Sequence, residues 1–276
     1  MKRRMFLTKL YEFGLFTFLK KPKVDLQIGK PILNVLLAID LSQENRKKDR
    51  LADLRAMDFF FRSKGEMAGM NVQVHTFLNA SFTPTHLIET INKIGDITKN
   101  QPQNSGIVFY FSGHGANFGD EIFPRFSFGN EVLAMNKLNA MIGACNPRLR
   151  FILADCCNNF IQGMSQIPNT ANPTDEDLVK KLFWDFGASN VKKTILICAA
   201  ERGEYSYSVE SGSIFQQMFR KAFYECTSND NINTSWEQIK NRTMKEVKRI
   251  LDRQSKTTGI NYGQSPIFTI ISTSDI

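Results

Sequence analysis

The chain has 276 residues, of which 42% are hydrophobic and 22% are charged. This composition excludes a disordered chain, a collagen and a coiled coil, and it supplies enough apolar surface for a sizeable core. No apolar run approaches the roughly 18 residues that a membrane-spanning helix needs. The net charge is +8, and the basic residues cluster at Met1–Lys23, Arg46–Arg50 and Lys240–Arg253 without forming a basic stripe interleaved with aromatic residues. We therefore expect solvated basic helix faces and no nucleic-acid partner.

Residues 1–30 form a basic N-terminal segment that we expect to lie outside the main domain. Arg3 and Arg4 precede a short apolar stretch, as in a twin-arginine export signal, but Glu12 interrupts it and no small-residue cleavage site follows. A degenerate signal, an interfacial anchor and a plain amphipathic helix stay open. We expect no cleavage and a cytoplasmic location, with export or membrane association as the alternative.

From residue 31 onward, apolar strand patterns alternate with amphipathic helix patterns. The predicted strands are Pro31–Asp40, Asn71–Leu78, Gly106–Ser112, Phe151–Asp155, Thr194–Ala200 and Ile267–Ser272. The predicted helices are Glu44–Lys64 (ended by Gly65), one opened by Thr83–Pro84, Asn130–Cys145, Asp175–Phe186, Ser213–Cys226 and Trp236–Arg253, with a loop at Ile161–Pro173. Apolar strands alternating with helices indicate one α/β domain over 31–276, with a mostly parallel sheet and helices on both faces.

Two chemically distinctive clusters lie where predicted buried strands end. His114 stands between Gly113 and Gly115 after one strand, and Cys156 and Cys157 follow the next. Open α/β sheets bind ligands at the carboxyl ends of their strands. If these two strands are neighbours, their ends lie about 5 Å apart. An imidazole and a thiol at that distance can form an activated thiolate nucleophile.

The remaining histidines and cysteines favour structural roles. His75 lies within a strand pattern and His86 near a helix start, while Cys145, Cys198 and Cys226 fall on elements where a buried thiol acts as a small hydrophobe. Five cysteines without a CxxC pair indicate reduced thiols rather than disulfides. Zinc bound at the strand ends is a weaker alternative, because adjacent cysteines rarely ligate one ion.

These residues resemble a known family. Phe109–Gly115 (FYFSGHG) resembles the histidine motif of the caspase-like cysteine peptidases, and Leu153–Cys157 (LADCC) resembles their nucleophile motif in its metacaspase form. Cys198–Ala200 and Gly212–Phe215 resemble the strand and helix of the small subunit. The resemblance covers roughly residues 31–273. It implies the caspase-hemoglobinase fold, with a six-stranded, mostly parallel sheet, and the activity of a cysteine endopeptidase.

Carried over residue by residue, the resemblance implies a Cys–His dyad. Cys157 is the implied nucleophile and His114 the general base and acid, without a third orienting side chain. The backbone N–H groups of Gly115 and Cys157 would form the oxyanion hole. Cys156 occupies a position that is usually Ser in metacaspases, so it is interpreted as a neighbour.

The same resemblance implies specificity for a basic P1 residue. Asp155 and Asp53 correspond to the two acids that line the S1 pocket of metacaspases, although Ala52 replaces an Asn. Two carboxylates in one pocket attract a cation, ideally a guanidinium. Arg or Lys at P1 is therefore expected. The alternative is that Asp53 is a helix-surface acid paired with Arg50 or Lys48.

The chain also departs from the family pattern. Asn158–Asn159 follows the nucleophile, and Asn159 is expected to adopt a left-handed backbone in place of glycine. No cofactor is expected, and calcium activation stays open. Self-cleavage is expected at Lys192–Lys193 rather than at Lys180–Lys181.

The leading hypothesis is a monomeric endopeptidase that acts on protein or peptide substrates. One rival is a catalytically inactive caspase-fold interaction module, which would have no reason to keep both dyad residues. A small-molecule-binding domain is disfavoured, because the sequence has no glycine-rich phosphate loop.

Overall fold

The computed structural model describes residues 30–98, 105–117, 121–160, 175–183, 191–228 and 234–274. Apart from residue 30, the basic N-terminal segment lies outside the described residues, and so does the predicted loop at 161–173. Among the helices described, none is long and apolar enough to cross a membrane.

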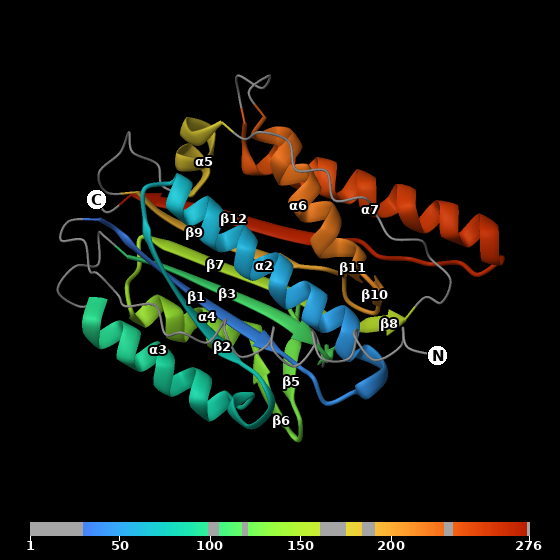
Figure 1. Cartoon of the computed structure of the whole chain (residues 1–276), viewed down its shortest axis with the longest axis horizontal. Helices are drawn as coiled ribbons and strands as arrows, with labels where there is room; N and C mark the ends of the chain where they lie inside the picture. The colour runs from blue at the N-terminus through green and yellow to red at the C-terminus, as the bar shows by residue number, and fades with distance from the viewer. Residues whose placement is uncertain are drawn as a thin grey trace, which may run out of the picture.

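A six-stranded sheet in the order β12-β9-β7-β3-β1-β2 forms the centre of the molecule (Figure 1). Its strands are β1 (Ile32–Ile39), β2 (Asn71–Phe77), β3 (Ser105–Gly113), β7 (Leu149–Cys156), β9 (Val191–Cys198) and β12 (Ile267–Ser274). Neighbouring strands are parallel except that β12 runs antiparallel to β9. Every residue of β3 is buried, as expected for a continuous apolar run covered on both faces. The predicted six-stranded, mostly parallel sheet is confirmed.

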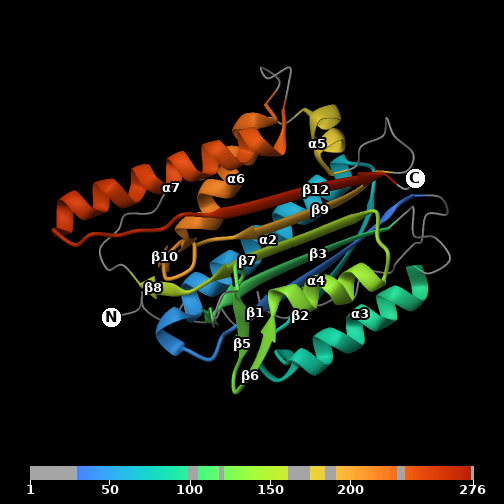
Figure 2. The same ribbon diagram turned by 180° about the vertical axis from the view of Figure 1, so that it is seen from behind.

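Helices cover both faces of this sheet (Figures 1 and 2). One face packs against α2 (Lys47–Met67), α5 (Glu176–Phe183), α6 (Ile214–Cys226) and α7 (Trp236–Thr258), and the other against α3 (Pro84–Thr98) and α4 (Met135–Ala144). Edge-to-face aromatic pairs hold the first layer together. Phe151 of β7, for example, lies 5.4 Å from Trp236 of α7 between ring centroids.

The prediction that Gly65 ends the first helix is wrong. Helix α2 continues to Met67, and the chain turns at Gly69, which has φ +76°. A Cβ on Gly65 would come within 2.6 Å of Val72 Cγ2 and 2.9 Å of Leu33 Cδ2. The glycine therefore allows a close approach of α2 to the sheet rather than a helix end.

The prediction of one helix over 130–145 is also wrong at its start. Residues 131–134 form β6 (Glu131–Ala134), which pairs with β5 (Arg125–Phe128), and helix α4 begins only at Met135. Gly129, at φ +64°, lies in the turn between the two strands. With β4 (Gly115–Ala116) they form a small antiparallel sheet at the carboxyl end of β3.

A second small sheet lies beyond the carboxyl end of β7. It consists of β8 (Asn158–Phe160), β10 (Ser206–Val209) and β11 (Gly212–Ser213). The short 3-10 helices η2 (Glu44–Arg46) and η3 (Asn79–Ser81) follow β1 and β2. All these short elements therefore follow the main strands at the edge where a ligand is expected.

Candidate active site

The predicted nucleophile and base lie together because β3 and β7 are adjacent parallel strands. Their register pairs Gly113 with Cys156. His114 and Cys157 each follow by one residue, at the carboxyl edge of the sheet. The assumption that these two strands are neighbours is confirmed.

Cys157 has a left-handed backbone with φ +70°. This conformation costs a non-glycine residue about 1–2 kcal/mol, so the surrounding contacts must hold it. The backbone N–H of Ser206 donates to the Cys157 carbonyl, and the Cys157 thiol donates to the Gly115 carbonyl at 3.1 Å. The prediction of a left-handed Asn159 is wrong, since Asn159 lies in strand β8.

Gly115 lies directly against the nucleophile segment. A Cβ at this position would lie 2.5 Å from Cys156 Sγ, so only glycine fits here without displacement. The close approach brings the backbones of Gly115 and Cys157 to the same corner, where the oxyanion hole is predicted.

The imidazole of His114 is half-buried and electrostatically poised as a base. Burial lowers its pKa, and the positive charges of Arg50 and Arg46 lower it further, against an opposing effect of Asp40. The neutral imidazole is thus favoured near pH 7. No hydrogen bond within the described part of the chain reaches the buried Nε2 atom of His114. Resting catalytic groups often lack the hydrogen bond that forms when substrate is bound.

The Cys157 thiol is activated by its neighbour. The Cys156 thiol hydrogen-bonds to it and lowers its pKa, against the effect of burial. Cys156 itself is fully buried, and its pKa is raised well above that of a free thiol by the same hydrogen bond and by one to Cys198. Of the two adjacent cysteines, Cys157 is therefore the one that ionises more readily.

Asp53 of α2 and Asp155 of β7 lie close together in a fully buried cluster. Asp53 accepts from the Ser112 hydroxyl at 2.9 Å and from the Ser213 N–H at 2.7 Å. Asp155 accepts from the Ser206 hydroxyl at 2.9 Å. The alternative of a surface Asp53 paired with a lysine or arginine is wrong, because its side chain is 1% exposed.

The two carboxyls perturb each other. Burial raises the pKa of Asp53 well above its usual range, and the charge of Asp155 raises it further. Burial also raises the pKa of Asp155 to about 6, although hydrogen bonds from Ser213 and Ser206 oppose this. Paired acids resist joint ionisation, so positive charge beside them is stabilising.

Three buried arginines lie near the predicted site, and one of them, Arg220 of α6, interacts electrostatically with Asp53. Arg46 lies in η2 and donates to Asp49 at 3.0 Å and to the hydroxyl of Ser208. Arg50 forms an ion pair with Asp40, at the end of β1, at 2.8 Å. Arg46 and Arg50 both act electrostatically on His114, and Arg46 also acts on Asp155.

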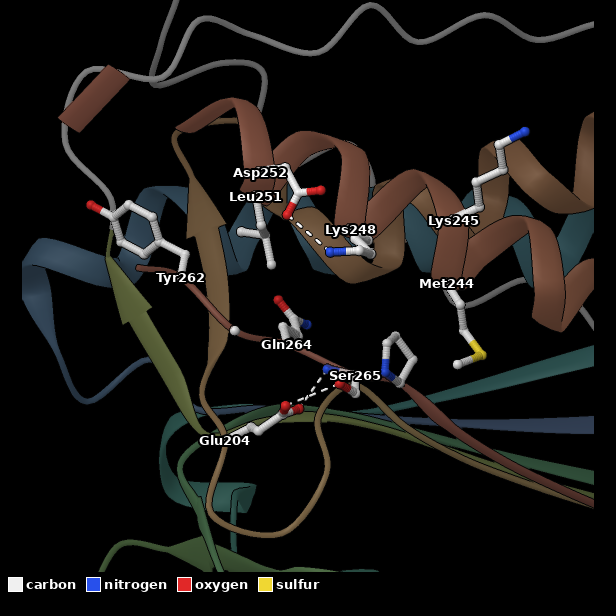
Figure 3. A pocket seen from close by; sticks show the side chains of 11 residues that line it. Glu204, Met244, Lys245, Lys248, Leu251, Asp252, Tyr262, Gln264 and Ser265 are labelled. Atoms are coloured by element: carbon white, nitrogen blue, oxygen red, sulfur yellow. Dashed lines mark hydrogen bonds and ion pairs between the residues drawn. The ribbon is translucent and has the colours of Figure 1, made fainter. Parts of the chain in front are cut away.

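A cavity of about 300 Å³ lies beside the site, between α7 and residues 262–266 (Figure 3). Glu204 lines one edge of it and accepts from the backbone N–H of Ser265 at 2.5 Å. Gln264, on its wall, donates to the Ser206 hydroxyl at 3.2 Å, and Ser206 in turn donates to Asp155. The cavity is lined by none of the predicted site residues but connects to one of them through two hydrogen bonds.

A family model described as the caspase domain (Peptidase_C14) matches residues 42–275. The chain therefore belongs to the caspase-domain family of cysteine peptidases. This membership supports cysteine peptidase activity at the level of the family, and with it protein substrates. The predicted caspase-like fold is confirmed.

Solved structures share the fold at low identity. Caspase-1 from Spodoptera frugiperda superposes with a TM-score of 0.53 at 12% identity, covering 87% of this chain and 88% of that one. The protein GSU0716 from Geobacter sulfurreducens gives 0.52 at 16% identity, covering 89% of this chain and 95% of that one. No curated protein matches the chain significantly.

Sequence reasoning missed several residues of the site. Arg46, Ser206 and Gln264 contact it through long-range packing, and no local pattern marks them. Ser112 stands within the histidine motif, and its register opposite Asp155 could have been deduced once the strands were taken as neighbours. Arg46 belongs to the basic run Arg46–Arg50, where a solvated position is the usual interpretation.

Proposed function

We propose that the protein is a cysteine endopeptidase that uses Cys157 and His114 as its dyad and cleaves after Arg or Lys. The observation that carries the proposal is the register of β3 and β7, which puts both residues at one edge of the sheet. The left-handed Cys157 and the neutral His114 support it.

The chemistry follows from the protonation states. His114 accepts the proton of the Cys157 thiol, and the thiolate attacks the scissile carbonyl carbon. The N–H groups of Gly115 and Cys157 stabilise the oxyanion. His114 then donates its proton to the leaving amine, and water attacks the thioester with His114 again as base.

Specificity is proposed to come from the carboxyl pair. Asp53 and Asp155 share a buried site in which each raises the other's ionisation cost, and a substrate guanidinium or ammonium would relieve that repulsion. A P1 carboxylate would add a further negative charge to the pair.

A panel of fluorogenic peptides that differ only at P1 tests both parts. The wild type should cleave Arg and Lys peptides and leave Asp peptides intact. Cys157→Ala should abolish cleavage, while Cys156→Ser, the matched control one residue away, should retain much of it. We propose that no cofactor is needed, so runs with calcium and with a chelator should give equal rates.

The opposite results have distinct meanings. Activity lost in Cys156→Ser but kept in Cys157→Ala would move the nucleophile by one residue. Equal rates on Arg and Asp peptides would refute the carboxyl-pair pocket. An inert panel, together with a Cys157 thiol whose alkylation rate is unchanged by His114→Ala, would favour a non-catalytic interaction module.

A further inference from the structure

Three of the five cysteines meet at the carboxyl ends of two adjacent strands. Cys156 ends β7 and Cys198 ends β9, and the parallel register places Ala154 opposite Cys198. Residues 154 and 156 point to the same face of the sheet, so Cys156 and Cys198 share that face. Both belong to the buried cluster under α3 and α4, and Cys157 packs against it.

We call Cys157, Cys156 and Cys198 the thiol relay, in which Cys156 lies between the other two. The pKa of the Cys156 thiol is raised by its interactions with both Cys157 and Cys198, as expected for neighbouring thiols. Gly115 contacts two members of the thiol relay. A Cβ on Gly115 would lie 2.5 Å from Cys156 Sγ, and the Gly115 carbonyl accepts from Cys157 Sγ at 3.1 Å. Thiols that lie on one face at neighbouring strand ends can exchange disulfide bonds once their side chains rotate toward each other.

Solvent reaches the thiol relay at one end only. Cys156 and Cys198 are 0% and 2% exposed, whereas Cys157 is partly exposed. A small oxidant therefore reaches the thiol relay at Cys157, which is also the thiol with the lowered pKa. In the proposed peptide hydrolysis neither Cys156 nor Cys198 forms a bond to the substrate, which leaves both thiols available for a second role.

We propose that Cys156 and Cys198 are a resolving pair that removes oxidation from Cys157 and stores it as a buried disulfide. In the first step the Cys157 thiolate attacks a hydroperoxide, and the O–O bond breaks to give a sulfenic acid and an alcohol or water. Cys156 then attacks that sulfur and releases water, which forms a Cys156–Cys157 disulfide. Cys198 attacks Cys156 and forms the Cys156–Cys198 disulfide, with Cys157 expelled as a thiolate.

In sum, two thiols and one hydroperoxide give one disulfide and one water molecule. The hydroperoxide also leaves behind an alcohol, or a second water molecule where it is hydrogen peroxide. A bond between adjacent residues is strained, so exchange toward Cys198 is downhill. The result protects the nucleophile from irreversible oxidation to the sulfinic acid. The inference rests on the reactive Cys157 of the proposed function, but it concerns thiol chemistry rather than turnover.

Mass spectrometry of the full-length protein treated with hydrogen peroxide tests the proposal. Remaining thiols are alkylated before trypsin digestion, which places Cys156–Cys157 and Cys198 on separate peptides because Lys180 and Lys193 lie between them. The wild type should give a reducible cross-link from Cys156 to the Cys198 peptide, with Cys157 alkylated. Cys198→Ala should stop at the Cys156–Cys157 disulfide.

Cys156→Ser should lose both disulfides and accumulate Cys157 sulfenic and sulfinic acids several-fold faster than the wild type. The matched controls are Cys145→Ala and Cys226→Ala, which remove buried thiols outside the thiol relay and should leave the cross-link unchanged.

Two results would overturn the proposal: no Cys156–Cys198 cross-link in the wild type, or equal rates of Cys157 over-oxidation in the wild type and Cys156→Ser. The outcome is distinguishable from that of the peptidase proposal. A cross-link in a protein without peptidase activity would refute only the peptidase proposal. An active peptidase without the cross-link would refute only the relay.

Discussion

Arg46 brings a resident positive charge to the region where a substrate cation is proposed to bind. It is 5% exposed, is held by Asp49 and Ser208, and acts on both Asp155 and His114. Two cations about 6 Å apart near a protein surface repel each other by on the order of 1–3 kcal/mol. Arg46 is therefore expected to weaken the binding of a basic P1 residue.

Replacing this arginine should sharpen the specificity of the enzyme. Arg46→Gln is expected to raise kcat/KM for Arg peptides by about tenfold, mainly through KM, and to change kcat/KM for a neutral P1 peptide much less, through the effect of Arg46 on His114 alone. Lys48→Gln, which removes an exposed cation paired with Glu210, is the matched control and should change neither. The double variant Arg46→Gln/Asp49→Asn guards against an unpaired buried acid. A lower kcat/KM on Arg peptides, whatever the change on acidic peptides, would contradict the prediction that Arg46 weakens the binding of a basic P1 residue.

The carboxyl of Asp155 predicts an unusual dependence of stability on pH. Burial raises its pKa in the folded protein to about 6, whereas the ordinary value is 3.8. As pH rises from about 4 to 6, the unfolded chain loses its proton before the folded chain does. The free energy of unfolding should therefore fall over this window, by up to about 3 kcal/mol from this group.

Urea unfolding at pH 4, 5, 6 and 7 measures this fall. Asp155→Asn, which cannot ionise, should show a smaller decrease between pH 4 and 6 than the wild type. Asp58→Asn, on the solvent side of α2 where Asp58 pairs with Arg62, should follow the wild type. Parallel curves for the wild type and Asp155→Asn would show that Asp155 does not titrate in this window.

Among the secondary-structure elements, β11 positions the carboxyl of Asp53. Gly212 has φ +113°, and a Cβ on it would collide with Asp53 Oδ1, while the next residue, Ser213, donates its N–H to the same oxygen. The backbone of β11 thus seals one side of the acid pair. This arrangement requires glycine for both backbone conformation and space.

Gly212→Ala should therefore lower kcat/KM for Arg and Lys peptides by tenfold or more, because Asp53 must move. Gly203→Ala is a matched control with φ +83° and no atom within 4 Å of the added Cβ. It imposes backbone strain without the collision, so it should lower the melting temperature and leave P1 preference unchanged. Equal effects of both variants on P1 preference would remove the proposed role of β11.

Local patterns predicted the long elements and failed on the short ones. The apolar runs of β1, β3 and β7 are unambiguous because a strand buried on both faces needs no alternation. Residues 131–134 were assigned to a helix, since four residues are too few to separate a period of two from one of 3.6. Gly65 was interpreted as a helix end because its close contact with Val72 comes from a distant part of the sequence.

The candidate site follows the same division. His114 and Cys157 were predictable because each follows a strand whose end is visible in the sequence. The surroundings of Asp155 were not predictable, because Ser206 donates to it from a segment about 50 residues away and Gln264 in turn donates to Ser206. Physical partners separated by such distances leave no periodic signal. The burial of Arg46 was missed for the same reason, since Ser208 is distant in the chain.

On the scale of the whole molecule, the sheet constrains where the chain can cut itself. Lys192 and Lys193 were predicted to precede a strand and to be the preferred self-cleavage site. The structure contradicts this setting, because both lie inside β9. Lys193 pairs with Leu149 of β7 on one side and Ser272 of β12 on the other. A peptidase cleft needs an extended segment free of such pairing.

We therefore expect no self-cleavage at Lys192–Lys193 in the folded protein. Cutting there would first require β9 to leave both neighbours, and β9 also carries Cys198 beside the nucleophile strand. The intact mass of the wild type, compared with that of Cys157→Ala, measures this directly. Lys192→Gln/Lys193→Gln should leave the mass pattern and the peptidase rate unchanged. A fragment that begins at Lys193 or Thr194 in the wild type and is absent from Cys157→Ala would show that β9 opens far enough to enter an active site, and that the edge of the sheet beyond β7 is less stable than its pairing indicates.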